Sequence, residues 1–196
     1  MGTMLKLDKV TKIYPGTDFR AVDELSFELE EGEICILVGP SGCGKTTAMK
    51  MINRLHSITS GKIFIDGQDV SSMDTIQLRR RIGYVIQNIG LFPNMTIAEN
   101  ISVIPNLLKW DKKKINERVH SLLEIVNLPA EEYKDRYPRE LSGGQQQRIG
   151  VARGMAGDPP IMLMDEPFGA IDPINRDHFQ NEFLKIQEKV KKTIVF

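Results

Sequence analysis

A run of eight residues, GPSGCGKT at positions 39–46, has the composition of a loop that binds phosphate groups. Glycines let backbone N–H groups turn inward around an anion, at the positive end of the helix that follows. The pattern predicts that Lys45 contacts the β- and γ-phosphates of a nucleotide and that Thr46 binds Mg²⁺. The predicted phosphate-binding residues are Gly39, Pro40, Ser41, Gly42, Cys43, Gly44, Lys45, Thr46 and Thr47.

Two acidic residues follow the apolar stretch Ile161–Met164. An Asp-Glu pair at a strand end is commonly a solvated turn, but in a chain with a phosphate loop it has a defined chemical use. Asp165 would hold Mg²⁺ through water, and Glu166 would orient and deprotonate an attacking water. The pair therefore predicts phosphoryl transfer to water.

The segment LSGGQ at residues 141–145 predicts a second helix start that can bind an anion. The hydroxyl of Ser142 and two glycines, Gly143 and Gly144, would open the helix, and Gln145 follows them. One nucleotide needs a single phosphate loop, so a second site indicates that the γ-phosphate of a partner subunit docks there. A helix cap with a flexible turn is the plainer alternative.

The elements that must position these residues follow from hydrophobic periodicity. Residues 5–8 and 25–30 alternate apolar and polar side chains, which predicts half-buried antiparallel strands. Residues 34–38 are continuously apolar, which predicts a strand buried on both faces before the phosphate loop. Further strands are predicted at 61–67, 161–164 and 193–196, and helices at 48–55, 115–126 (ended by Pro129), 143–152 and 173–190, the last capped by Asp172.

Composition limits the function classes. The 196 residues include 26 basic and 26 acidic side chains, a net charge of zero, so no bulk attraction to nucleic acid is expected. A 41% hydrophobic content excludes disorder, and no apolar run approaches the ~20 residues of a membrane-spanning helix. The two cysteines cannot form a disulfide framework. Cys35 is expected in the core and Cys43 as a packing side chain within the loop, not as a nucleophile.

The phosphate loop, the LSGGQ segment and the Asp-Glu strand, in this order, closely resemble the ATP-binding cassette ATPases of membrane transporters over essentially the whole chain. The resemblance implies a P-loop NTPase fold. Its RecA-like α/β core with an antiparallel β edge would comprise residues 1–90 and 149–196, and an inserted helical subdomain would comprise residues 91–148. It also implies ATP and Mg²⁺ as cofactors and a homodimer that closes head to tail over two Mg-ATP.

Three further positions match the family's pattern. Tyr14 lies where the family places an aromatic ring that stacks on adenine, although a core or edge-strand aromatic residue is the alternative. Gln87 matches the glutamine that senses Mg²⁺ and couples to the transmembrane subunit, and a permease helix would dock near it and Phe92. Asp172 matches a loop at the dimer interface, a role compatible with capping a helix.

The chain departs from the family in one respect. Family members carry a switch histidine after the next strand, whereas this sequence stops within that strand at Phe196. We expect the native chain to continue, with that histidine and paired regulatory CBS domains. His178 is no substitute, and His56 and His120 are expected to be helix residues that face solvent.

The type of cassette follows from spacing and local resemblance. Leu141 comes 54 residues after Gln87, which leaves no room for the coiled-coil arm of DNA-repair members. Residues 79–87, 91–96 and 164–176 resemble the importers of glycine betaine, carnitine and choline. The implied partners are permease subunits and, indirectly, a solute-binding protein, with no nucleic acid, at the cytoplasmic face of the membrane. A methionine or other amino-acid importer and a soluble ATPase are the alternatives.

Overall fold

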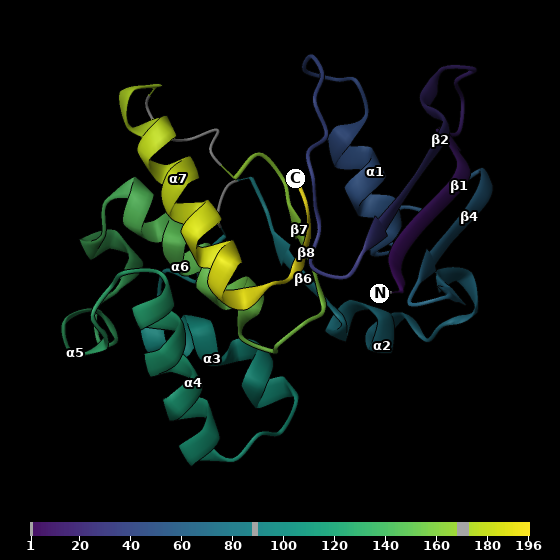
Figure 1. Ribbon diagram of the computed structural model, residues 1–196. Coiled ribbons are helices and arrows are strands. Elements are labelled where there is room, and N and C mark those ends of the chain that lie inside the picture. The colour runs from purple at the N-terminus through teal and green to yellow at the C-terminus, as the bar shows by residue number, and fades with distance from the viewer. Residues whose placement is uncertain (1, 88–89, 168–172) are drawn as a thin grey trace. The chain divides into compact units, whose positions relative to one another are not determined.

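The computed structural model describes residues 2–87, 90–167 and 173–196, which form two compact units (Figure 1). Unit 1 comprises residues 1–82, 160–165 and 192–196, and unit 2 comprises residues 83–159 and 166–191. The elements of unit 1 are β1 (Thr3–Ile13), β2 (Arg20–Glu30), β3 (Ile34–Cys35), α1 (Lys45–Ile52), β4 (Ser60–Ile65), β5 (Gln68–Asp69), η1 (Val70–Ser72), α2 (Thr75–Arg80), β7 (Ile161–Met164) and β8 (Thr193–Val195). Those of unit 2 are α3 (Ile97–Leu107), α4 (Lys112–Ile125), α5 (Ala130–Tyr133), η2 (Pro138–Glu140), α6 (Gly143–Met155) and α7 (Pro173–Val190), and β6 (Ile82–Val85) spans the sequence boundary.

An antiparallel sheet in the order β2-β1-β4-β5 accounts for the first part of unit 1 (Figure 1). β1 pairs on both sides, so that Leu7 lies opposite Phe27 of β2 and Ile63 of β4. Leu5 and Leu7 are buried, whereas Asp8 is exposed. The alternation predicted from the sequence is confirmed, and this sheet is the antiparallel β edge that the resemblance implied.

Three strands of unit 1 run parallel in the order β3-β8-β7. Every residue of β7 and β8 is buried, which confirms the strands predicted at these positions. The N–H of Gly32 donates to Thr193 Oγ1 at 2.9 Å, across 161 residues of sequence. β7 thus carries Asp165 directly after its last residue, and β3 leads toward the phosphate loop.

The strand predicted at residues 34–38 is shorter and more exposed than expected. β3 spans only Ile34–Cys35, and the side chains of Ile36 and Val38 are 60% and 88% exposed. The ladder continues only as far as Leu37, whose N–H donates to the carbonyl oxygen of Phe196 at 2.6 Å. Regular pairing with β8 joins Ile34 to Ile194 and Cys35 to Val195, which limits β3 to these two residues.

Unit 2 is built from helices, with α3 packed on α4 and α6, and α4 also packed on α5 and α6. The predicted amphipathic helix is α4, and its apolar face is buried. It ends before Pro129, contrary to the prediction, because Asn127 adopts a left-handed φ of 56°. The N–H of Asn127 donates to Glu124 and that of Leu128 to Leu123, which closes the helix in a Schellman motif. Pro129 instead precedes α5.

The last long helix, α7, begins at Pro173 as predicted, and its side chains Phe183 and Ile186 are buried. Asp172, its predicted cap, lies outside the described residues, as does the side chain of His178. None of the helices in the described ranges is long and apolar enough to cross a membrane.

Candidate nucleotide-binding site

The loop at residues 39–44 leads into α1 without a side-chain cap. Gly44 is the N-cap residue of α1, with a left-handed φ of 98°. A Cβ added at Gly44 would lie 2.3 Å from the backbone oxygen of Ala21, so that only glycine fits there. As a glycine, Gly44 has no side chain that could cap the N–H groups of the first turn. These N–H groups therefore point their partial positive charge toward a site that an anion can occupy.

Lys45 lies across the loop that precedes it. Its Nζ donates to the carbonyl oxygens of Gly39 at 2.8 Å and Pro40 at 3.0 Å, and lies 3.6 Å from Cys43 Sγ. The ammonium group is thus already held at the loop. Cys43 is exposed, yet its Sγ would lie 2.5 Å from a Cβ added at Gly39, so its side chain packs within the loop as expected.

Thr46 and Asp165 come together in unit 1 from opposite ends of the sequence. Thr46 Oγ1 donates to Asp165 Oδ1 at 2.7 Å, and Asp165 is only 6% exposed. Mg²⁺ prefers oxygen ligands of this kind and keeps several waters, so these two residues fit the predicted ion without further acidic groups. In the described part of the chain, no cluster of three or more His, Cys, Asp or Glu side chains could bind a metal instead.

Two predicted residues of unit 2 also contact each other. Gln87 Nε2 donates to Glu166 Oε2 at 2.6 Å, although 79 residues separate them in sequence, and both side chains are exposed. The amide fixes one carboxylate oxygen and leaves the other free to accept a proton. The geometry suits a carboxylate that acts as a base, with the glutamine beside it.

The LSGGQ segment opens α6 as predicted. Ser142 Oγ accepts a hydrogen bond from the N–H of Gln145 at 3.3 Å, and Gln145 Oε1 accepts one from the N–H of Ser142 at 2.9 Å, which is a reciprocal capping box. Gln145 Nε2 also donates to the hydroxyl of Tyr133 at 3.1 Å. Gly143 is exposed, with no atom within 4 Å of an added Cβ, so a ligand can approach the helix start closely.

Tyr14 has an environment that the sequence did not reveal. Its hydroxyl oxygen lies 2.8 Å from His56 Nδ1 and 3.4 Å from Thr47 Oγ1, and both Tyr14 and His56 are half-buried. The expectation that His56 faces solvent on a helix is wrong, because α1 ends at Ile52 and His56 lies in the bend that follows. No motif marks His56, since its role depends on a contact across 42 residues.

The environments of Cys35 and His120 agree only in part with the expectations. Cys35 is half-buried rather than in the core, and burial raises the pKa of its thiol. His120 is on α4 as predicted, half-buried, with Nδ1 3.7 Å from Glu131 Oε1.

Comparison with known proteins identifies the family. The model of the ABC transporter family matches residues 22–169, which include the phosphate loop, the LSGGQ segment and the Asp-Glu pair. The chain belongs to the ABC transporter family.

Curated relatives are similar along 98% of this chain. The osmoprotectant import ATP-binding protein OsmV of Salmonella typhimurium is 56% identical over 195 residues. The glycine betaine/carnitine/choline transport ATP-binding protein OpuCA of Bacillus subtilis is 58% identical over 193 residues. The chain spans about half the length of these curated relatives, 51% and 50% respectively.

Solved structures of ABC cassettes are similar in fold. A dimeric bacterial ABC transporter cassette has a TM-score of 0.82 at 32% identity, with 98% of this chain and 87% of that chain covered. The same cassette in a post-hydrolysis dimer bound to ADP and Pi also has a TM-score of 0.82, at 33% identity, with 98% and 86% covered. The predicted P-loop NTPase fold is confirmed.

Proposed function

We propose that this chain is the ATP-hydrolysing subunit of an importer for quaternary-amine osmoprotectants such as glycine betaine, carnitine and choline. The observation that carries the ATPase part is the uncapped, glycine-bounded start of α1, with Lys45 held at the loop. The similarity to proteins named for osmoprotectant, carnitine and choline transport supports the solute class.

In this proposal the residues of unit 1 bind Mg-ATP. Backbone N–H groups of the loop and of the first turn of α1 cradle the phosphates, and Lys45 moves from its carbonyl contacts to the β- and γ-phosphates. Thr46 and Asp165, already hydrogen-bonded to each other, hold Mg²⁺, and Tyr14 stacks on adenine. When bound, Mg²⁺ neutralises the charge that develops on the phosphate oxygens.

The residues of unit 2 supply the base and the contact with a second copy of the chain. Glu166 takes the proton of the attacking water, and Gln87, which donates to its other oxygen, orients it and responds to the ion. Ser142, Gly143 and Gly144 would face the γ-phosphate bound to the partner. The similarity to dimeric cassettes supports this arrangement, with Asp172 at the interface.

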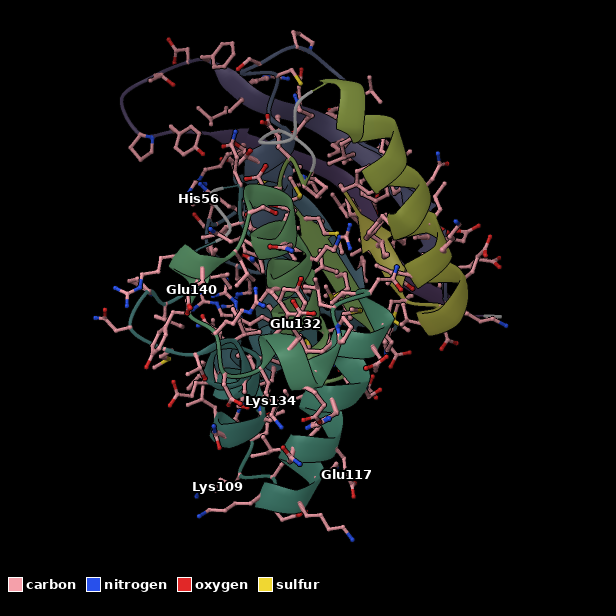
Figure 2. The ribbon with its side chains drawn as sticks, turned by 90° about the vertical axis from the view of Figure 1, so that its left-hand side faces the viewer. His56, Lys109, Glu117, Glu132, Lys134 and Glu140 are labelled. Atoms are coloured by element: carbon pink, nitrogen blue, oxygen red, sulfur yellow. The ribbon has the colours of Figure 1, made fainter. Side chains whose placement is uncertain are left out.

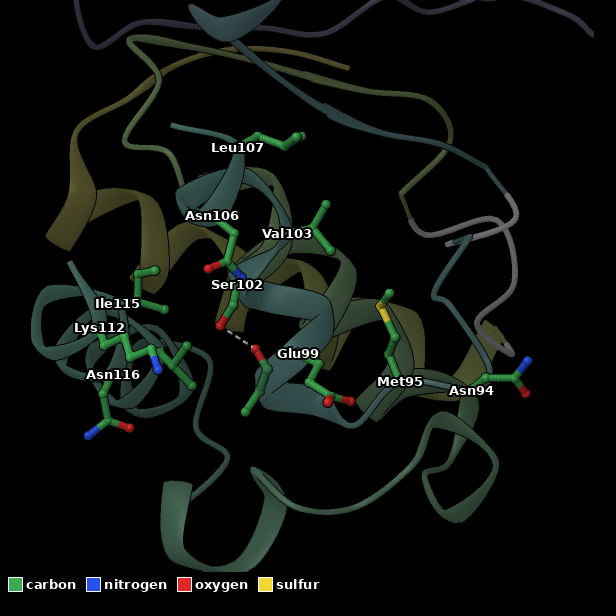
Figure 3. Close-up of a pocket in the computed structure, with 12 residues that line it drawn as sticks. Asn94, Met95, Glu99, Ser102, Val103, Asn106, Leu107, Lys112, Ile115 and Asn116 are labelled. Atoms are coloured by element: carbon green, nitrogen blue, oxygen red, sulfur yellow. Dashed lines mark hydrogen bonds between the residues drawn. The ribbon is translucent and has the colours of Figure 1, made fainter. Parts of the chain in front are cut away.

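We infer that the permease docks on unit 2, at the cytoplasmic face of the membrane. A groove of about 910 Å³ lies between α3 and α4 (Figure 3). Apolar side chains such as Met95 and Ile115 line it together with polar ones such as Glu99 and Lys112. Phe92, next to the groove in sequence, is 46% exposed. Arg153 of α6 donates to the carbonyl oxygen of Gly90 at 2.6 Å and holds this segment to the helices. These features suit an amphipathic helix of a permease.

The test of the whole proposal is uptake of labelled glycine betaine at high salt, in cells with and without the gene. Uptake should be lost without the gene and restored by the native gene and by Lys62→Ala, an exposed lysine of the same unit, but not by Lys45→Ala. Uptake that does not depend on the gene, once redundant carriers are removed, contradicts the osmoprotectant assignment and directs the search to amino acids and other solutes.

A second test isolates the chemistry. Glu166→Gln should bind ATP, stop hydrolysis and trap the dimer, as read by phosphate release and size-exclusion chromatography. Glu188→Gln, an exposed carboxylate on α7, is the matched control. Normal turnover by Glu166→Gln would show that Glu166 is not the base.

A further inference from the structure

The aromatic ring of Tyr14 is held by a histidine. The Tyr14 hydroxyl lies 2.8 Å from His56 Nδ1, and the two rings meet edge to face, with centroids 5.7 Å apart and planes at 87° (His56 is labelled in Figure 2). A hydrogen bond at one end and a perpendicular ring along the side fix both the hydroxyl and the plane of the phenol.

Two further side chains restrain the same ring. Lys12 Nζ lies 5.0 Å from the ring centroid, and Lys12 is itself only 7% exposed, with Nζ donating to Ser57 Oγ at 3.3 Å. The 3.4 Å contact with Thr47 is long for a hydrogen bond and adds a weaker connection. Thr47 belongs to the first turn of α1, so the ring is connected to the helix that begins at the phosphate loop.

The charge state of His56 suits this contact. Burial, and then the positive charges of Lys50 and Lys12, lower the pKa of His56 from its ordinary 6.5. A neutral imidazole with its proton on Nε2 accepts the phenol hydrogen at Nδ1. An imidazolium cannot accept the phenol hydrogen, and its Nδ1–H would instead donate to the phenol oxygen, with a third positive charge beside Lys12 of β1 and Lys50 of α1. The bond in which the phenol donates therefore exists only in the neutral form.

We propose that His56 is a positioning residue for base recognition, which holds the Tyr14 ring in the orientation that stacks on adenine. The inference rests on the proposed function, because it requires that Tyr14 contacts the base. Tyr14 is only half-buried, so part of its ring is open to a ligand. His56 touches Tyr14 and not the nucleotide, and its effect is confined to the base.

The experiment compares ATP with inorganic tripolyphosphate, which carries the phosphates without the base, by titration calorimetry with Mg²⁺ present. The variants are His56→Leu, which lacks an acceptor, and His56→Asn, whose Oδ1 takes the place of Nδ1. Tyr14→Leu reports the stacking itself, and His120→Leu, another half-buried histidine in unit 2, is the control. Thermal unfolding of each variant checks that the fold is retained.

We expect His56→Leu to weaken ATP binding about three- to tenfold, the effect of one net hydrogen bond, and to leave tripolyphosphate binding within about twofold. His56→Asn should restore ATP binding. If Tyr14→Leu weakens ATP binding and His56→Leu does not, the positioning role is overturned and the proposed function stands. If Tyr14→Leu also leaves ATP binding unchanged, the base contact of Tyr14 fails and the inference with it. Equal loss for both ligands in His56→Leu overturns the inference as a general distortion of the loop.

A pH series adds a readout that a merely structural role would not change. As the pH drops below about 6.5, protonation of His56 turns Nδ1 from an acceptor into a donor and adds a positive charge beside Tyr14, so the ratio of ATP to tripolyphosphate affinity should fall further in the native chain than in His56→Asn. His56→Asn carries the same change in ligand ionisation and serves as the reference. Once native His56 has been shown to titrate in the range used, an identical pH dependence of the ratio in both chains contradicts the proposal.

Discussion

The starts of α1 and α6 are both rich in glycine, yet they are completed differently. At α1 the N-cap is Gly44, in a left-handed conformation with no side-chain cap. At α6 the N-cap is Ser142, and its hydroxyl and the amide of Gln145 form a capping box. Each helix has N–H groups in its first turn that need an acceptor.

The two helix starts differ in whether a side chain of the chain itself or a ligand accepts hydrogen bonds from the N–H groups of the first turn. The α6 start satisfies its third N–H internally, so the helix is preformed and offers a ligand only Ser142, Gly143 and Gly144. The α1 start satisfies none through a side chain, so a bound phosphate contributes more to that helix. We infer that ATP binding stabilises unit 1, whereas the α6 start of unit 2 is ready before it meets a nucleotide.

The largest effect is expected at Gly44. Gly44→Ala forces a side chain into a left-handed backbone and against Ala21 oxygen, which costs about 3 kcal/mol of unfolding free energy and disrupts ATP binding. Gly42→Ala, at φ 82° with no atom within 4 Å of the new Cβ, carries the conformational strain alone and should cost about 1 kcal/mol. Urea unfolding measures both, and equal losses would contradict the steric account.

The next effect concerns the α6 cap. Ser142→Ala should lower the unfolding free energy by about 1 kcal/mol, because one N–H loses its acceptor, and should also impair hydrolysis. Asp111→Ala removes the corresponding cap of α4, where Asp111 Oδ1 accepts from the N–H of Lys114 at 2.9 Å. It should cost similar stability without loss of turnover. Equal loss of turnover in both variants would reduce Ser142 to a structural residue.

A smaller effect separates stability from activity. Gly143→Ala replaces a glycine in the first turn of α6 where an added Cβ meets nothing, so stability should rise, by up to about 1 kcal/mol. Hydrolysis should nevertheless fall, since in the proposed dimer the methyl group would lie where the partner's phosphate approaches. Chemical unfolding and phosphate release are the measurements, and a stabilised variant with full turnover would contradict the role of α6 as an anion site.

The smallest effect concerns acid stability near α1. The pKa of His56 is lowered from 6.5 in the folded chain, so the unfolded chain binds the proton more readily. The unfolding free energy should therefore fall slightly as the pH drops below about 6.5, and this part of the fall should be absent in His56→Asn. The test compares the urea midpoints of the native chain and of His56→Asn above and below about pH 6.5. An identical pH dependence in the two chains would contradict the prediction.

Local pattern predicted much of the fold and of the site. The alternation in β1, the apolar face of α4 and the Ser142 cap each depend on residues near one another in sequence, and each is confirmed. The prediction was wrong where the outcome depends on distant partners or local backbone geometry. Residues 34–38 form a short strand because β8 limits the pairing, and α4 ends before Pro129 because Asn127 turns left-handed.

Contacts between side chains were the least predictable part of the site. The pairs Thr46–Asp165 and Gln87–Glu166 lie 119 and 79 residues apart. The motifs indicate that each residue belongs to the site, but not which one bonds to which. His56 belongs to no motif, and only its 2.8 Å contact with Tyr14 reveals it.

The position of β8 has a consequence for the order of events during synthesis. β8 lies between β3 and β7, and Gly32 bonds to Thr193, 161 residues later. At ~5–20 residues per second, a ribosome needs roughly 10–30 s to make the intervening chain. During that interval β3 and the phosphate loop have emerged without the central strand of their sheet. The nascent chain thus carries Ile34 and Cys35 without their partner strand for many seconds.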